Sequence, residues 1–382
     1  MKWVGWTILA IYPTFTLLLS TLGSESPIYL AFCLGAFACY ARQKYAWTAV
    51  FAALALLSRG DGLLVGVVLG IDYLVRVRQP IPWKAVITYL LIALPWFGFA
   101  WAYFGSPLPA TLAAKQSQGS LAISQRFAEG FLSLARDHLA LWEFKIEAIL
   151  AAAGVIYAIA RQRRWIIFFS WTILYFLAYT ALGVSRYFWY YAPLVPGFLA
   201  AVGLGIAAFG QLLQNRADLS TKKRFFTAST LLPLILLAPL AVAQIQNVFE
   251  LRGSSDRRYE VYRQIGNWLR QHTPASAVVG ALEVGIIGYY AQRSMVDFAG
   301  LLQPDIAAQL TPHTTYEDAA IWTMGCYQPE YLVLHDRLFP RLEQGVVAQR
   351  CRSIQKMDGK AYGYSADMVI YTCAEYERSA CP

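Results

Sequence analysis

The stretch WKAVITYLLIALPWFGFAWAYF, residues 83 to 104, decides the class of fold. Its only charged residue is Lys84, and a helix needs about 20 apolar residues to cross the hydrocarbon core of a bilayer. The rest of the chain has the same character, since 57% of its 382 residues are hydrophobic and 14% are charged. A soluble globular protein is about half apolar and a quarter charged. The sequence therefore predicts an integral membrane protein.

Nine segments have the composition of membrane spans. The second to fourth are short, and they rely on flanking arginines and lysines that reach the interface. No small-residue cleavage site closes the first segment, so it is predicted to be a span and not a removed signal peptide. The nine are Trp3–Leu22, Pro27–Ala41, Tyr45–Leu57, Gly62–Val75, Trp83–Phe104, Phe144–Ala160, Trp165–Leu182, Tyr191–Leu213 and Phe225–Phe249.

Positive charge follows the even-numbered spans. Its clusters lie at residues 42–44, 76–84, 161–164 and 216–224. The positive-inside rule places these loops in the cytoplasm, so the other connections and everything after Phe249 are predicted to be extracytoplasmic. The basic residues behind the net charge of +9 are thereby explained by the orientation of the spans in the membrane, and no nucleic-acid partner is expected.

Two structured elements are predicted on the outer side. Between residues 121 and 136, Phe127, Phe131 and Leu132 share a helical face with two alanines, which indicates a helix in the plane of the interface. After residue 250, short apolar runs bounded by polar residues predict strands at 277–282, 294–300, 331–335 and 367–373, and helical spacing predicts a helix over 259–271. The predicted fold is mainly α: a polytopic transmembrane domain (1–250) of about nine helices and a small extracytoplasmic α/β domain (251–382).

Cysteine usage is consistent with an extracytoplasmic C-terminal domain. Cys326, Cys351, Cys373 and Cys381 lie in this polar part of the chain and permit disulfides, with three pairings open. These cysteines are widely spaced and the four histidines are scattered, so no zinc site is predicted.

Ionisable and aromatic residues gather at the outer ends of the predicted spans. The segment LSRGDGLL (57–64) carries Arg59 and Asp61, and Glu25 ends the preceding outer connection. The loop SRYFWYYAPLVPG (185–197) adds Arg186, Tyr187 and Tyr190, and FGSPLPATLAAKQ (104–116) adds Lys115. Arginine suits a lipid-linked phosphate because its planar fork offers several donors, and aromatic rings can stack on sugars. The same residue types also anchor spans without any ligand. An adhesion role for the RGD tripeptide is not expected, because it is held between two spans.

Five pieces resemble the glycosyltransferase C superfamily, which includes the protein mannosyltransferases and the aminoarabinose transferase of lipid A. They are LGSESPIYL (22–30), ALLSRGDGLL (55–64), LPWFGFAWAYFGSPLPATLAAK (94–115), SRYFWYYAPLVPG (185–197) and ALEVGIIGYYAQRSMVDFAGLLQPDI (281–306). The resemblance implies inverting transfer of a sugar from a polyprenyl-phosphate donor outside the cytoplasmic (inner) membrane. A carboxylate would deprotonate the acceptor and cations would steady the leaving phosphate. Whether a divalent metal takes part stays open.

The resemblance also assigns roles to individual residues. Arg59 and Asp61 match the charged positions of the family's LTRPEG-like element, with Gly60 in place of its proline, and Arg186 with Tyr187 resembles the pair that faces the donor phosphate. The family's catalytic aspartate lies in a long first outer loop, whereas the first outer loop here is GSES. The resemblance therefore implies a shortened or divergent relative, in which the nearby Glu25 takes the place of the catalytic aspartate. The predicted catalytic residues are therefore Glu25 and Asp61, and the predicted binding residues are Arg59, Lys115, Arg186, Tyr187 and Tyr190.

Three functions are compatible with these features. The first is a membrane glycosyltransferase, or a truncated relative, whose acceptor is a glycan, a lipid or a protein. The second is a non-catalytic membrane protein whose outer domain binds a glycan or a partner. The third is a transporter of lipid-linked glycans, against which the charges at span ends and the lack of an internal repeat argue.

Overall fold

The computed structural model describes residues 2–216, 222–253 and 256–374, without the side chains of 110 and 213–232. The chain divides into two compact units. We call Met1–Pro107, Phe127–Leu182 and Arg186–Gly253 the helical unit, and Leu108–Arg126, Gly183–Ser185 and Ser254–Pro382 the α/β unit. The main division thus falls at Gly253, close to the predicted residue 250, and two short segments from earlier in the chain join the second unit.

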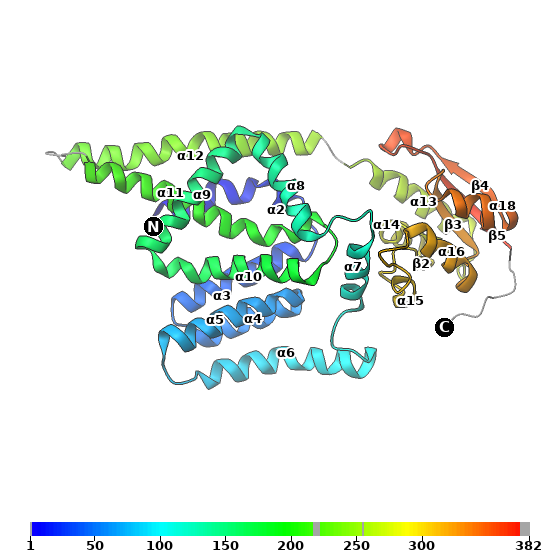
Figure 1. The fold of residues 1–382 in the computed structure, drawn as a ribbon, viewed down its shortest axis with the longest axis horizontal. Coiled ribbons are helices and arrows are strands. Elements are labelled where there is room, and N and C mark those ends of the chain that lie inside the picture. The colour runs from blue at the N-terminus through cyan, green and yellow to red at the C-terminus, as the bar shows by residue number, and fades with distance from the viewer. Residues whose placement is uncertain (1, 217–221, 254–255, 375–382) are drawn as a thin grey trace. The chain divides into compact units, whose positions relative to one another are not determined.

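The helical unit contains the predicted apolar helices (Figure 1). Within the described ranges, four helical stretches are long and apolar enough to cross a membrane: Trp83–Phe104, Arg163–Leu182, Phe188–Leu212 and one that begins at Pro233. The other apolar helices of the described residues are shorter or carry more charge. The helices of this unit are α1 (Lys2–Ile11), α2 (Thr16–Leu19), α3 (Ser26–Ala41), α4 (Tyr45–Ser58), α5 (Leu63–Asp72), α6 (Trp83–Phe104), α8 (Phe127–Ala140), α9 (Trp142–Arg161), α10 (Ile166–Leu182), α11 (Val195–Arg216) and α12 (Lys222–Gly253).

The first predicted span is not one continuous helix. Helix α1 ends at Ile11, a 3₁₀ turn follows over Tyr12–Thr14, and Phe15 is extended before the short α2 begins. Pro13 accounts for the break, because proline has no backbone N–H and its ring clashes with the preceding helical turn. The expectation of a single helix over Trp3–Leu22 was therefore wrong.

Helices α9 and α11 form the closest packing in the helical unit. A Cβ atom at Gly154 of α9 would overlap the carbonyl oxygen of Ala201 in α11, so only glycine permits this approach. Small residues play this role in membrane helix pairs, where close van der Waals packing and not the hydrophobic effect drives association. The buried core around the pair includes Leu150, Leu199 and Ile206.

A helix forms where the interfacial helix was predicted, with shifted ends. Helix α8 covers Phe127–Ala140, whereas residues before it belong to the α/β unit. Phe127 is fully buried and the ring of Phe131 lies 5.0 Å from that of Phe176. Leu132, predicted on the same face, is instead 65% exposed. One helical face thus packs on the bundle, and Leu132 points away from it.

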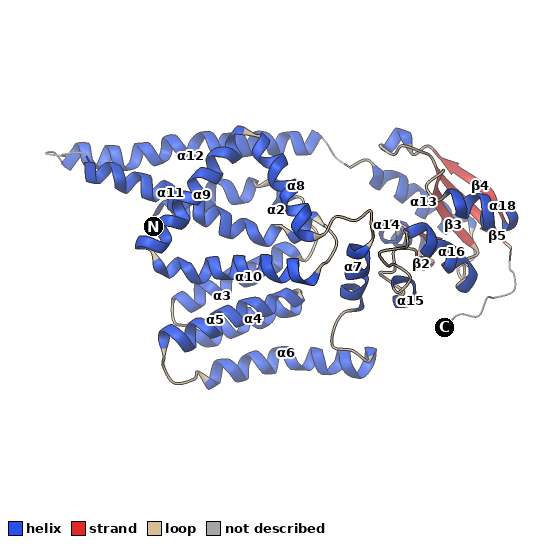
Figure 2. Ribbon diagram, viewed as in Figure 1, coloured by secondary structure: helices blue, strands red, loops and turns tan. Residues whose placement is uncertain are grey.

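The α/β unit holds a five-stranded sheet of order β2-β1-β3-β5-β4 (Figure 2). Strand β1 pairs in parallel with β2 and β3, whereas β5 pairs antiparallel with β3 and β4. The four predicted strands are confirmed, and β4 was not predicted. The strands are β1 (Val278–Ala281), β2 (Ser294–Asp297), β3 (Tyr331–His335), β4 (Cys351–Met357) and β5 (Met368–Cys373).

Helices pack on this sheet, and the chain segment before α8 joins them. The predicted helix is confirmed as α13 (Arg258–His272), which buries Val261, Ile265 and Leu269. Leu121, which follows helix α7, lies in a core cluster with Val296. The helices are α7 (Ala110–Ser120), α13, α14 (Val284–Ala291), α15 (Pro304–Ala307), α16 (Tyr316–Cys326), α17 (Pro340–Leu342) and α18 (Ala348–Arg350).

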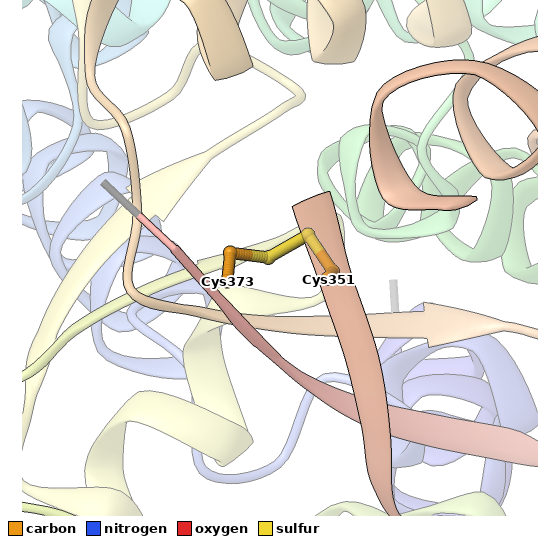
Figure 3. Close-up of a disulfide and its surroundings, with 2 residues drawn as sticks. All are labelled: Cys351 and Cys373. Atoms are coloured by element: carbon orange, nitrogen blue, oxygen red, sulfur yellow. A yellow bond between two sulfur atoms is a disulfide. The ribbon is translucent and has the colours of Figure 1, made fainter. Parts of the chain in front are cut away.

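One of the predicted disulfides joins the two antiparallel strands at the edge of the sheet. Cys351 and Cys373 are bonded between opposed positions of β4 and β5 (Figure 3). Cys326 is also disulfide-bonded, and Cys381 lies outside the described residues. Of the open pairings, the structure thus selects the one that contains Cys351–Cys373.

Candidate functional site

The site begins where α4 ends. The backbone of Arg59 is extended, which stops the helix at Ser58, and a single 3₁₀ turn over Gly60–Gly62 leads into α5. A Cβ atom at Gly62 would overlap the backbone carbonyl of Ala55, so glycine is needed for the turn to fold back on α4. This geometry carries the side chain of Arg59 into the bundle, where the residue is 9% exposed.

Every nitrogen of the Arg59 guanidinium donates to a protein oxygen. Its Nη2 lies 2.8 Å from Asp61 Oδ2 and 3.0 Å from the hydroxyl of Tyr179. Its Nη1 donates to Ser26 Oγ at 3.1 Å and to Glu25 Oε1 at 3.4 Å. The Nε donates to both oxygens of Asp61. The Nη2 also donates to the hydroxyl of Tyr175 at 3.4 Å. Arg59 therefore holds two acidic residues and three hydroxyl groups at one place, which we call the Arg59 cluster.

Tyrosine rings enclose the Arg59 cluster. The guanidinium carbon lies 5.1 Å from the ring centre of Tyr29 and 5.8 Å from that of Tyr190, both within range of a cation–π interaction. Tyr175 stacks on Tyr179 at 4.6 Å, and its hydroxyl donates to the carbonyl oxygen of Tyr190 at 2.9 Å. These contacts fix the arginine in a low-dielectric setting, where its interactions with carboxylates are stronger than in water.

The two carboxylates of the cluster differ in access. Asp61 has 7% of its side chain exposed, and it accepts a 2.6 Å hydrogen bond from Tyr179 as well as the arginine. Glu25 has 51% of its side chain exposed and makes only the longer contact to Arg59. Asp61 is therefore held as a buried acceptor, whereas Glu25 is open to a ligand or to proton exchange.

The loop after α10 places the remaining aromatic residues beside the cluster. The ring of Tyr187 stacks on Trp189 at 4.5 Å and meets Tyr190 edge-on at 5.8 Å. Arg186 is exposed, and its aliphatic stem passes over Gly130 of α8. The structure thus brings together Glu25, Arg59, Asp61 and Tyr190, with Tyr187 next to Tyr190.

Lys115, the remaining predicted binding residue, lies in the other compact unit. It lies in α7 of the α/β unit, where its carbonyl oxygen accepts a hydrogen bond from the backbone of Ser185 at 3.2 Å. In the same helix, the side-chain amide of Gln118 donates to the carbonyl of Ala299, which follows β2, at 2.8 Å. The structure thus gives the Lys115 segment a place in the fold of the second unit.

Sequence reasoning missed Ser26, Tyr175 and Tyr179. The two tyrosines are four residues apart in the apolar run WTILYFLAYTAL, and this spacing puts both hydroxyls on one helical face. Polar groups on one face of an otherwise apolar span were the signal that could have found them. The buried side chains of Arg59 and Asp61 are also inconsistent with an exposed RGD adhesion loop.

The acidic residues of the site do not fit a divalent metal. In the parts of the chain that the structure describes, no three His, Cys, Asp or Glu side chains are grouped so as to hold an ion. Glu25 and Asp61 instead share one arginine. We therefore derive no chemical step through a metal.

Comparison with known proteins informs only the C-terminal part of the chain. Residues 246–376 match a family described as a domain of unknown function (DUF8728). The matched residues include the five strands and the helices from α13 to α18. Neither a curated protein nor a solved structure matches the chain.

Proposed function

We propose that this protein is a membrane glycosyltransferase, or a relative of one, that takes a sugar from a polyprenyl-phosphate donor. The observation that carries the proposal is the Arg59 cluster, in which an accessible carboxylate stands beside a fixed cation and tyrosine rings. A transferase of this kind needs a base for the acceptor hydroxyl and a preorganised site for the sugar and phosphate.

We assign Glu25 as the base. It would take the proton of the acceptor hydroxyl while the acceptor oxygen bonds to the anomeric carbon and the bond to the phosphate oxygen breaks. The phosphate leaves with the electron pair, and the configuration inverts. Glu25 suits this role because half of its side chain is exposed, whereas Asp61 is enclosed by Arg59 and Tyr179.

We assign the phosphate contact to Arg186. The donors of Arg59 already serve Asp61, Glu25, Ser26 and Tyr179, so this arginine acts as a positioning residue. Arg186 is exposed and stands one residue before Tyr187, whose stacked ring offers a surface for a sugar. A guanidinium binds a phosphate through parallel hydrogen bonds, which also orients the leaving group.

The proposal includes a topology with nine crossing segments and the Arg59 cluster at the extracytoplasmic surface of the inner membrane. The basic connections between the predicted spans support it through the positive-inside rule. The Cys351–Cys373 disulfide supports an extracytoplasmic α/β unit, because disulfides persist in oxidising compartments. A glycan, a lipid or a protein would then meet the site from outside.

Binding of the common leaving group is the first test. Polyprenyl phosphate itself, without a sugar, is titrated into the purified protein in nanodiscs and bound lipid is counted by native mass spectrometry. We expect Arg186→Ala to weaken binding and Arg186→Lys to restore part of it. Arg163→Ala, in a predicted cytoplasmic loop, is the matched control. Equal binding by Arg186→Ala and wild type would overturn the phosphate assignment.

Sugar transfer is the second test. Membranes that supply polyprenyl-phosphate sugars, labelled in the sugar, are incubated with the wild type or with Glu25→Gln. We expect Glu25→Gln to bind polyprenyl phosphate normally and to lose transfer. Binding without transfer in the wild type would favour the non-catalytic alternative. Movement of labelled lipid across vesicles without transfer would favour the transporter.

A further inference from the structure

A second group of buried polar side chains lies between α9 and α12, apart from the Arg59 cluster. Two carboxylates, Glu143 and Glu147, are 3% and 0% exposed and stand one turn apart on α9. Each is met by an amide from α12. Asn247 Nδ2 donates to Glu143 Oε1 at 3.1 Å, and Gln244 Nε2 donates to Glu147 Oε1 at 3.3 Å.

Among the described residues, neither Glu143 nor Glu147 forms an ion pair. An isolated ionised carboxylate in an apolar interior is so unfavourable that such a group takes up a proton instead. Ionisable residues inside membrane helices are accordingly rare and functional. The deeper of the two, Glu147, is where this argument applies most strongly.

Two oxygen atoms of this group have no hydrogen-bond partner. They are Glu147 Oε2 and Gln244 Oε1, both buried within the described part of the bundle. An ionised carboxylate only accepts hydrogen bonds, so it cannot serve the amide oxygen of Gln244. A protonated carboxyl gains one O–H donor. A proton on Glu147 Oε2 therefore makes this atom a donor, and Gln244 Oε1 is then available as an acceptor.

We propose that Glu147 and Gln244 form a proton-binding site between α9 and α12, with the proton carried by the carboxyl of Glu147. The site does not depend on the proposed sugar transfer, since it rests on other residues. Proton release would leave a charge between two packed helices, so protonation couples to the contact of α9 with α12.

Amides, an imidazole and apolar side chains surround the two carboxyl groups. From α12 the site is faced by the neutral amides of Gln244 and Asn247. From α8, His138 meets the ring of Phe144, at 4.6 Å between ring centres, and its Nδ1 is engaged with the carbonyl of Leu134. The nearby residues of α11 are apolar or small. Two carboxyl groups one helical turn apart repel each other when both are ionised, so a proton on one of them removes that repulsion.

A hydrophobic carbodiimide tests the proposal, because it modifies carboxyl groups that are protonated in apolar surroundings. The intact protein in nanodiscs is treated with dicyclohexylcarbodiimide at neutral pH, and modified residues are located by peptide mass spectrometry. We expect modification at Glu147 in the wild type and in Glu143→Gln, and none at this position in Glu147→Gln. As the pH rises above the titration midpoint, the modified fraction should fall about tenfold per pH unit.

Two further measurements make every outcome decisive. Glu147→Gln replaces the protonated acid by a neutral group of the same shape, so it should fold and should lose the alkaline instability expected of the wild type. Failure of this variant to fold, or an unmodified Glu147 in the folded wild type, would overturn the proposal. The reaction is repeated in sodium chloride and in choline chloride. Protection by sodium alone would mean that a metal cation, and not a proton, occupies the site.

Discussion

Removing the charge of Arg59 should destabilise the helical unit strongly, because the arginine is the ion partner of a buried carboxylate. The informative change is Arg59→Met, which keeps a long flexible side chain and deletes the guanidinium. It leaves Asp61, with 7% of its side chain exposed, with the hydroxyl of Tyr179 as its remaining donor. An uncompensated buried charge results.

The size of the effect follows from the exposure of each partner. Removing one member of a buried ion pair costs about 3–5 kcal/mol, because the other charge is left in a low dielectric. The pair with Glu25 adds at most about 1 kcal/mol, since an ion pair with a solvent-exposed partner is weak. We therefore expect Arg59→Met to lower the free energy of unfolding by about 3–5 kcal/mol. Arg59→Met with Asp61→Asn should recover part of this loss.

The free energy of unfolding is measured for the wild type, for Arg59→Met, for Asp61→Asn and for the double variant. The proteins are unfolded in mixed micelles by titration with sodium dodecyl sulfate, and tryptophan fluorescence follows the unfolding. Arg42→Met is the matched control, because Arg42 is exposed and its guanidinium donates to the carbonyl of Ala38. The reasoning is refuted if Arg59→Met is as stable as the control. It is also refuted if the double variant is less stable by the full sum of the single losses, since the two charges would then be independent.

Three other substitutions probe the parts of the fold that hold the sites. Gly62→Ala should destabilise the turn after α4, because a Cβ atom there overlaps Ala55, and thermal unfolding of the variant beside Gly60→Ala measures it. Replacing Cys351 by serine should cost about 2–4 kcal/mol through the lost constraint on the unfolded chain and should raise hydrogen exchange in β5. Burial lowers the pKa of His335, so its contribution to stability is complete above the unfolded pKa of about 6.5 and is lost as the pH falls through the folded pKa. The protection factors of the β3 amides, corrected for the intrinsic exchange rate at each pH, should therefore fall in acid, and His335→Phe should remove that fall.

Local sequence patterns predicted most of the helices and strands, because their buried residues form apolar runs or recur at regular spacing. Helix α6 has the predicted bounds, and strands β1, β2, β3 and β5 follow apolar runs that lie in the core of the sheet. Strand β4 (Cys351–Met357) was missed because it is an edge strand of mostly half-buried and exposed residues, with no apolar run to mark it. Pro13 indicated the break in the first span, but the span was predicted from the hydropathy of the whole segment and the proline was not considered.

The Arg59 cluster was predictable in part for a different reason. Charged residues at span ends stand out in an apolar chain, so Glu25, Arg59 and Asp61 were found, and the structure brings them within hydrogen-bonding distance. Tyr179 was not found, because its role depends on how α10 packs beside the α4 end, a long-range contact that hydropathy does not encode.

Asp61 and Glu147 are both buried carboxyl groups, but they have different partners, and comparing the stability of two variants distinguishes them. Both carboxyl groups are buried in the helical unit, but Asp61 faces a guanidinium and Glu147 faces an amide. Asp61→Asn should therefore cost about 3–5 kcal/mol, because Arg59 then becomes a buried charge with a weaker partner. Glu147→Gln should change the free energy of unfolding by less than about 1 kcal/mol at neutral pH, because it exchanges one neutral hydrogen-bonding group for another. Equal losses in the two variants would mean that Glu147 is ionised, and that a cation lies beside it.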